Sequence, residues 1–422
     1  MKKLYFTKEK IGWILYDFAD SSYVTIIVTV LFSLYFKDIV VGQEELGTAL
    51  WGRAISISML FVALLAPFIG AVADYSHSRK LLLMLASYIT IVFTAFLYFV
   101  QKGDIALAML LFIVSNFAFG MCNVFYNSFL PDIAEKHEVG RISGISWGIG
   151  YLGGLAALLL VMPIMNLSLP DDLEYRYSFF LVAVFFFIFS LPTFFWLKEK
   201  RKPNIEKKNY FIVGFQRIKE TAKHIRKFKE LLKYLLSFFF MNDGIVVIMS
   251  FAAIYGGYLG LTTQEVLFSF ILAQPSSFLG ALIFGFITDK IGAKKSISIS
   301  LLLWVIVIVG AYLSVTKTHY YILVICAGFL MGSSQASGRT MLALLTPVKK
   351  ATEFFGFYNF TGRMAAILGP LVYGEISRVT GEQRYGILSI MLFFIAGFIV
   401  LQFVNEKKGE NVAVEMNEFM EN

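Results

Sequence analysis

Two short stretches decide the fold: G-A-V-A-D-Y-S-H-S-R-K, residues 70–80, and G-F-I-T-D-K-I-G-A-K-K, residues 285–295. Each contains a glycine, an aspartate four residues later and a basic pair at its end, and the two lie 215 residues apart. Each stretch also follows a long apolar run. Self-similarity at a fixed offset indicates that the chain contains the same structural unit twice.

A second echo supports the duplication. Pro131 and Gly153 recur as Pro347 and Gly369, at an offset of 216 residues. Two echoes at nearly one offset are hard to obtain by chance, and two equal halves allow a binding site between them. We therefore predict an N-terminal half at 1–197, a basic amphipathic cytoplasmic linker at 198–231, a C-terminal half at 232–404 and a disordered cytoplasmic tail at 405–422.

The composition requires a bilayer. Of 422 residues, 58% are hydrophobic and only 16% are charged, whereas soluble domains are about a quarter charged. The mean hydropathy is +0.71. The apolar runs reach the ~20 residues that a spanning helix needs, so we predict an all-α integral membrane protein with twelve transmembrane helices. We place these helices at about 11–36, 49–73, 81–100, 105–130, 142–165, 177–197, 232–258, 264–288, 296–315, 319–345, 353–378 and 385–404.

The net charge of +8 fits a membrane surface better than nucleic acid, because the basic residues lie in loops between apolar runs. They concentrate in alternate loops, which predicts that both termini are cytoplasmic in a multi-pass protein of a bacterial inner cell membrane. The basic linker is expected to lie on the anionic inner leaflet, with partner binding as the alternative. The polar, mostly acidic tail is expected to be disordered.

Ionisable groups inside the apolar runs are candidate site residues, because burying them in lipid is costly. The first run contains Asp17, Asp20 and Tyr23, and the seventh contains Asn242 and Asp243. We predict that Asp17 and Asp243 face each other across a central cavity. Proton coupling and binding of a solute amino group are both open to these carboxylates, and a structural hydrogen bond is the third alternative.

Two arginines lie deep in later runs. Arg363 shares one helix face with Asn359, next to Tyr358, and with Arg339 it is a candidate to clamp a solute carboxylate. Interhelical hydrogen bonding is the alternative for the neutral amides. The remaining polar candidates are Asn123, Asn127, Gln274 and Gln335.

Arg53 and Glu375 lie near the outer ends of the second and eleventh runs. We predict that they pair as an outer gate, although Arg53 is also placed where it would extend to the lipid headgroups. No phosphate-cradling loop, metal-ligand spacing or catalytic constellation is legible in the sequence. The sequence therefore predicts no enzyme activity, cofactor or metal.

The duplicated stretch resembles the loop signature of the major facilitator superfamily. In that family the aspartate and basic residues form a cytoplasmic latch when the cavity opens outward. The resemblance assigns this latch to Gly70, Asp74, Arg79, Lys80, Gly285, Asp289, Lys294 and Lys295. The first copy departs from the pattern at Ser78, where a second glycine is common.

Six further stretches resemble a narrower branch, the vacuole-effluxer-like proteins, which include the fungal autophagy-related amino-acid permease. They are W-I-L-Y-D-F-A-D-S-S-Y (13–23), F-Y-N-S-F-L-P-D-I-A (125–134), G-R-I-S-G-I-S-W-G-I-G-Y-L-G-G (140–154), N-D-G (242–244) with S-F-A-A-I-Y-G (250–256), and E-F-F-G-F-Y-N-F-T-G-R (353–363). Asp20, where that branch usually has Asn, and Glu375 depart from its pattern.

The resemblance implies a secondary transporter that acts by alternating access. We expect a monomer that moves a small polar solute, with proton-coupled amino-acid efflux as the first candidate. Uptake or exchange of a sugar or an organic anion is the alternative within transport. A non-transporting membrane receptor or scaffold is the alternative outside it.

Overall fold

The computed structural model describes residues 6–167, 169–199, 216, 228–365 and 368–419. Most of the predicted basic linker, and with it the expectation of an amphipathic surface helix, lies outside these described residues.

The described residues form helices and connecting turns, without strands. The first half contains α1 (Lys8–Ser22), η1 (Tyr23–Val30), α2 (Leu31–Leu34), η2 (Tyr35–Val41), α3 (Glu44–Ser76), α4 (Arg79–Phe96), η3 (Leu97–Phe99), α5 (Ile105–Asn127), α6 (Leu130–Ile133), α7 (Val139–Met165), η4 (Pro170–Asp172) and α8 (Leu173–Trp196). The second half contains α10 (Lys229–Tyr258), α11 (Thr263–Ile291), α12 (Ala293–Leu313), α13 (Lys317–Leu345), η6 (Val348–Lys350), α14 (Ala351–Ala365), α15 (Leu368–Thr380) and α16 (Gln383–Gln402), and α17 (Glu406–Phe419) follows it.

Eleven helices among the described residues are long and apolar enough to cross a membrane. The first, Lys8–Val41, joins α1, η1, α2 and η2 into one span. The twelfth apolar stretch is described in two pieces, α14 and α15, on either side of residues 366–367. The predicted twelve-helix, all-α membrane fold is confirmed.

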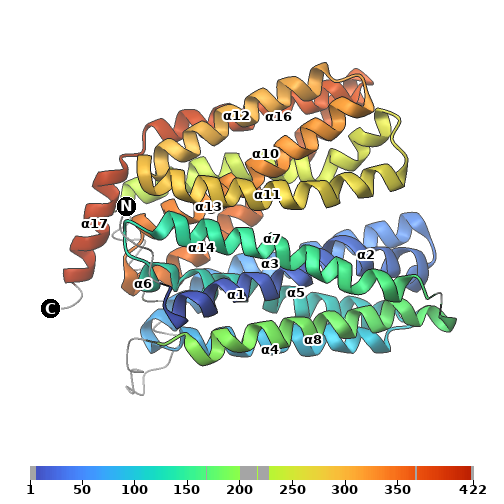
Figure 1. Ribbon diagram of the computed structural model, residues 1–422, viewed down its shortest axis with the longest axis horizontal. Helices are drawn as coiled ribbons and strands as arrows, with labels where there is room; N and C mark the ends of the chain where they lie inside the picture. Colours follow the sequence, from blue (N-terminus) through green and yellow to red (C-terminus); the bar gives the residue numbers. More distant parts are fainter. Residues whose placement is uncertain (1–5, 168, 200–215, 217–227, 366–367, 420–422) are drawn as a thin grey trace.

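The two halves lie side by side and meet along a seam. In Figure 1 most of α1–α8 lies below and most of α10–α16 above. The main contacts across the seam join α7 to α11 and α3 to α14. Residues with small side chains make this approach possible: a Cβ on Gly144 of α7 would lie 2.3 Å from the carbonyl oxygen of Ala281 in α11.

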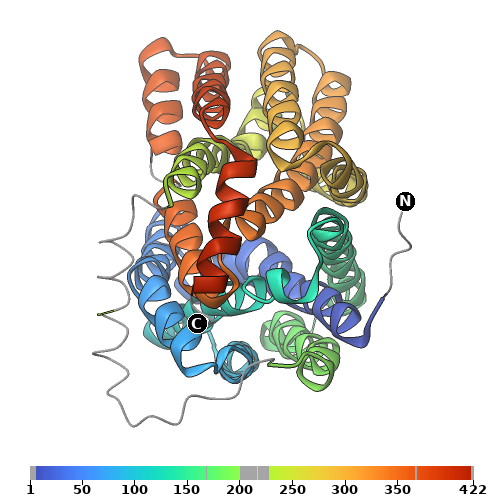
Figure 2. The ribbon, with the colours of Figure 1, turned by 90° about the vertical axis from the view of Figure 1, so that its left-hand side faces the viewer.

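One end of the bundle carries the basic loops around Arg79–Lys80, Lys136, Lys294–Lys295 and Lys349–Lys350, and we call it the basic end. Helix α1 begins at this end and α17 lies there too (Figure 1). Seen from the basic end, α17 extends from the second half across the seam (Figure 2).

The prediction of a disordered tail was wrong, because residues 406–419 form α17. Ala413 and the carboxylate-bearing Glu410 are buried on it, and Val412 and Met416 pack against the core. Apolar residues three to four positions apart give even a polar helix one face to bury. The charged composition of this segment therefore gave no indication of a helix that is stabilised by packing against the core.

Candidate functional site

The first copy of the latch joins α3 to the start of α14. Asp74 is buried at the end of α3 and accepts hydrogen bonds from Thr352 N (3.2 Å), Thr352 Oγ1 (2.8 Å) and Glu353 N (2.9 Å). The first-turn N–H groups of a helix have no partner within the helix, so a carboxylate stabilises them. Gly70 permits the contact, since a Cβ there would lie 2.5 Å from the Thr352 carbonyl oxygen.

The second copy makes the same contact in the opposite direction. Asp289, near the end of α11, accepts from Gly140 N (2.8 Å), Arg141 N (3.1 Å) and Arg141 Nε (2.7 Å) at the start of α7. A Cβ on Gly285 would lie 2.8 Å from the Gly140 carbonyl oxygen. Each half therefore caps a helix of the other half, and together the copies close the seam at the basic end.

The predicted basic residues of the latch act mainly within their own halves. Arg79 donates to Asp132 (2.6 Å) and to Glu199 (2.9 Å), and Glu199 also accepts from the backbone N–H of Lys80 (3.2 Å). These contacts connect α4 to α6 and to the segment that follows α8 without crossing the seam.

The second copy repeats this capping. Glu406 accepts from the backbone N–H groups of Ala293 (2.8 Å) and Lys294 (3.1 Å) at the start of α12. Lys294 Nζ donates to the carbonyl of Gln402, and Lys295 is exposed. In both copies a glutamate from the segment after the last helix of the half therefore caps the helix that follows the latch aspartate.

Another ion pair lies beside the start of α7. Lys10 near the start of α1 binds Glu138, the residue before α7, and both side chains are buried. Burial alone raises the pKa of Glu138, but the hydrogen bond from Lys10 and the backbone N–H of Glu135 outweigh burial and hold this pKa below its usual range. Glu138 is therefore ionised at neutral pH.

Arg339 forms the centre of a polar cluster deeper in the seam. It comes from α13 of the second half, yet it donates to three residues of the first half: Asp17 Oδ2 (3.0 Å), Asn127 Oδ1 (3.1 Å) and Ser143, through both Oγ (3.0 Å) and the carbonyl (2.7 Å). Only 3% of Arg339 is exposed. This buried charge pair connects the halves at a second depth, beyond the latch.

Aromatic rings surround the same guanidinium. The Arg339 Cζ lies 4.8 Å from the ring centroid of Trp13 and 5.2 Å from that of Trp147, distances at which cation–π attraction is favourable. Asp17 also accepts from Ser146 Oγ (2.6 Å), which bonds to the hydroxyl of Tyr126 (2.7 Å). The cluster is therefore held rigidly from the first half.

Three polar groups near this pair lack protein partners among the described residues. Asp20 is 5% exposed, lies one helical turn from Asp17, and makes no hydrogen bond or ion pair there. Trp147 Nε1 and Tyr151 OH, one turn apart on α7, are buried donors without an acceptor. Buried polar groups normally have partners, so such groups in one region indicate a place for a polar ligand.

Asp243 does not pair with Asp17. It is fully buried in α10, where Oδ1 accepts from Gly369 N of α15 (2.8 Å) and Oδ2 has no hydrogen-bond partner in the described part of the chain. Since Asp17 is bonded to Arg339, the two carboxylates lie in different contacts, and each of them is buried.

Several of the other predicted site residues have partners within their own half. Asn242 donates to the Gly362 carbonyl (3.0 Å), and Tyr358 stacks on Phe238 with centroids 3.9 Å apart. Asn123 and Asn359 each donate to the carbonyl four residues earlier in their helix. Arg363, Gln274 and Gln335 are half-buried.

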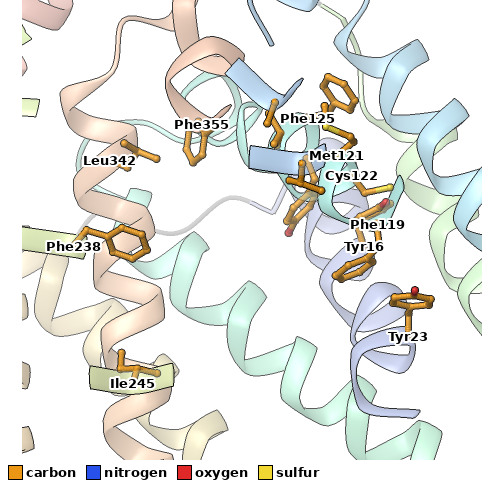
Figure 3. Close-up of a cluster of buried hydrophobic side chains, with 14 of the residues drawn as sticks. Tyr16, Tyr23, Phe119, Met121, Cys122, Phe125, Phe238, Ile245, Leu342 and Phe355 are labelled. Carbon is orange, nitrogen blue, oxygen red and sulfur yellow. The ribbon is translucent and has the colours of Figure 1, made fainter. Parts of the chain in front are cut away.

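Tyr23 points into the first half and contacts Ser115 (2.8 Å). Figure 3 shows Tyr23 beside Tyr16 and Phe119, apart from Phe238 of the second half.

Arg53 in α3 and Glu375 in α15 are both exposed at the end opposite the basic end. Beside them, a Cβ on Gly52 or on Gly374 would meet no atom within 4 Å. The contacts described above close the seam at the basic end instead, so the predicted outer gate remains a prediction about a different conformation.

Sequence reasoning missed Trp13, Ser143, Ser146, Trp147 and Tyr151. The signal for them was weak, because aromatic and hydroxyl side chains are common in membrane helices. Within the described residues, no group of three or more His, Cys, Asp or Glu side chains is arranged to hold a metal ion.

Comparisons with known proteins agree with this architecture. Residues 48–414 match the protein family described as vacuole effluxer Atg22 like. An uncharacterized MFS-type transporter of Bacillus subtilis, YxiO, is 30% identical over 427 residues, which cover 98% of both chains. Autophagy-related protein 22 of Kluyveromyces lactis is 23% identical and covers 86% of this chain and 80% of its own.

Two solved structures show the same fold. The proton:xylose symporter XylE, bound to 6-bromo-6-deoxy-D-glucose, superposes with a TM-score of 0.70 at 14% identity, covering 96% of each chain. FucP in the outward conformation superposes with a TM-score of 0.71 at 12% identity, covering 94% of this chain and 98% of its own.

Proposed function

Since the chain belongs to the vacuole effluxer Atg22-like family of major facilitator transporters, we propose that it exports a small zwitterionic solute, an amino acid in the first place, by proton-coupled alternating access. Its family and fold are those of membrane transporters and not of enzymes. The basic end faces the cytoplasm of a bacterial cell in this proposal, and the protein acts as a monomer in the cell membrane.

The observation that carries the proposal is the buried Asp17–Arg339 pair across the seam, next to unpaired polar groups. An amino acid carries one carboxylate and one ammonium group. Arg339 can bind the carboxylate in a bidentate manner, and Asp17 with Asp20 can accept the ammonium. The donors Trp147 Nε1 and Tyr151 OH supply further partners for carboxylate oxygens.

The pair also explains why an empty transporter would resist opening at the basic end. Separation of the halves there removes Asp17, Asn127 and Ser143 from Arg339. A buried charge that loses its partner costs about 3–5 kcal/mol. A bound zwitterion replaces the lost partners on both sides, so the loaded transporter opens at a lower cost than the empty one.

A ligand screen tests the solute class. Purified protein is heated with single amino acids, sugars or organic anions, because a ligand that binds the folded state raises its apparent melting temperature. We expect stabilisation by one or more amino acids, lost in Arg339→Ala and kept in Arg384→Ala, whose side chain lies in α16 away from the cluster.

Counterflow of the stabilising amino acid in proteoliposomes then tests movement. Stabilisation by sugars or organic anions alone would replace the amino-acid assignment. Binding without any counterflow would favour the receptor or scaffold alternative.

A further inference from the structure

Asp17 and Asp243 were predicted to face each other, and among the described residues Asp243 has no cation beside it. It is 0% exposed, its Oδ1 accepts from Gly369 N (2.8 Å), and its Oδ2 is buried without a partner among the described residues. Asp17, in contrast, is neutralised by Arg339. An ionised carboxylate has two oxygens that need donors, and here one of them has none.

The backbone opposite Asp243 is specialised for this contact. Pro370, in the first turn of α15, has no N–H to donate, and the N–H of Gly369 donates to Asp243. A Cβ on Gly369 would lie 2.6 Å from Asp243 Oδ1 and 2.3 Å from Val247 Cγ2, so only glycine permits the approach. Gly369–Pro370 therefore combines a contact to the carboxyl with a site where this helix can bend.

The surroundings offer no charge compensation. Phe394 of α16 packs against Gly244, and the next turns of α10, at Val247 and Phe251, border a pocket lined by apolar side chains. Within the span, the charged or titratable groups on helices packed against α10 are Arg339 on α13, Tyr358 and Arg363 on α14, and Tyr373 and Glu375 on α15. Cys326 on α13 is exposed, and Glu353 lies in the first turn of α14. The remaining groups on α11, α13, α15 and α16 lie near helix ends, and those of α17 lie outside the spans.

None of these groups makes an ion pair or hydrogen bond with Asp243 in the described part of the chain. A bare carboxylate at this place would cost several kcal/mol. A carboxylic acid would not, because Oδ1 still accepts from Gly369 and the proton on Oδ2 removes the charge.

We propose that Asp243 is the proton-carrying residue of this transporter, protonated at Oδ2 in the conformation closed at the basic end. When the halves rearrange and the helix bends at Gly369–Pro370, water reaches Oδ2, the O–H bond breaks, and the proton passes to that water and leaves a carboxylate. The inference rests on the proposed transport for its purpose, but the protonation itself does not require a known solute.

Infrared spectroscopy of the full chain in lipid tests the proton directly, since a protonated carboxyl has a C=O band that a carboxylate lacks. We expect this band in the wild type at neutral pH and a loss of intensity from it in Asp243→Asn, since Asp20 is a second buried carboxyl that can contribute to the same region of the spectrum. Asn keeps an oxygen for the N–H of Gly369, so the fold is expected to survive. Asp17→Asn is the matched control and should keep the band, because Asp17 is paired with the guanidinium of Arg339.

Identical bands in the wild type and Asp243→Asn overturn the proposal. So does a band that disappears only in Asp20→Asn, because the proton then lies on α1. If Asp243→Asn fails to fold, the wild type is treated with dicyclohexylcarbodiimide, which adds to protonated buried carboxyls. A mass adduct on Asp243 supports the proposal, and adducts only elsewhere refute it. The solute screen has no part in either measurement, so failure of the amino-acid assignment is distinguishable.

Discussion

The two copies of the latch have the same geometry but differ in charge. Asp74 of the first copy is satisfied by neutral donors: two backbone N–H groups and the hydroxyl of Thr352. Asp289 of the second copy is bound by backbone N–H groups and by the guanidinium of Arg141 from the other half. A duplicated sequence has thus preserved a helix-capping contact while one copy added an ion pair across the seam.

The basic pairs that follow show the opposite distribution. In the first copy Arg79 is bound by two carboxylates of its own half, whereas in the second copy Lys294 Nζ donates to a neutral carbonyl. The charged contacts of the first copy therefore connect segments of the first half to each other, whereas the charged contact of Asp289 in the second copy joins the two halves. We expect the second copy to contribute more to closing the seam.

The largest difference is expected from removal of each aspartate. Asp289→Ala leaves the buried Arg141 without its partner and should destabilise the closed seam by about 3–5 kcal/mol. Asp74→Ala leaves only neutral donors unsatisfied and should cost about 1–3 kcal/mol. Spin labels at the exposed positions Glu135 and Lys295, in a Cys326→Ser background, report the closed and open populations. Equal shifts in both variants would contradict the asymmetry.

Substitution of the latch glycine should have similar effects in the two copies, because a steric clash does not depend on the charges of the neighbouring residues. Gly70→Ala places a Cβ 2.5 Å from a carbonyl oxygen of the other half, and Gly285→Ala places one 2.8 Å from such an oxygen. We expect each substitution to destabilise the conformation closed at the basic end, relative to the open one, by about 1–3 kcal/mol. Gly52→Ala, where a Cβ meets nothing within 4 Å, is the control in the same label assay. An unchanged label distance in Gly70→Ala would show that α3 and α14 can shift without cost.

Acid should weaken the contact between α1 and the start of α7, within the first half, through Glu138. Its pKa is held below the usual value by Lys10 and by the Glu135 N–H, so its contribution is fully present above that usual value and is lost as the pH falls through the lowered pKa. Melting temperatures of the wild type and Glu138→Gln should therefore differ at neutral pH and converge in acid. A constant difference down to the lowest accessible pH would exclude this ion pair as the cause.

The smallest effect is expected at α17. Lys136 of the first half pairs with Glu410 on α17, but 70% of the Lys136 side chain is exposed. Pairs of this kind contribute about 0.2–1 kcal/mol. A double-mutant cycle of Lys136→Ala and Glu410→Gln, read with the same labels on the closed population, should give a coupling in this range. A coupling above that of the Arg141–Asp289 pair would contradict the expectation that the α17 contact is the weaker of the two.

Much of the fold was predictable because the bilayer imposes simple rules. Apolar runs of spanning length gave the helices, and the offset between residues 70–80 and 285–295 gave the two halves. The same echo located Gly70, Asp74 and their counterparts in the latch. The partners of the aspartates were not predictable. Helices were expected to begin near Arg141 and Thr352, but hydropathy does not specify which residue of the other half will cap a helix start.

The candidate site was predictable residue by residue but not as a constellation. Asp17, Asp243 and Arg339 stood out because charge is rare in such runs. Their pairing depends on the rotation and depth of helices more than 200 residues apart in the chain, which hydropathy does not specify. Hence Asp17 was matched with Asp243 by symmetry, although Arg339 is the residue that reaches it.

Helix α17 offers a practical use. Because it begins in the second half and contacts Lys136 of the first, its surroundings change whenever the two bodies part at that end. Val414 on this helix is 56% exposed and can carry an environment-sensitive dye. The fluorescence of a protein labelled there would change as the protein opens and closes at the basic end. Candidate solutes could then be compared by this fluorescence change in intact vesicles.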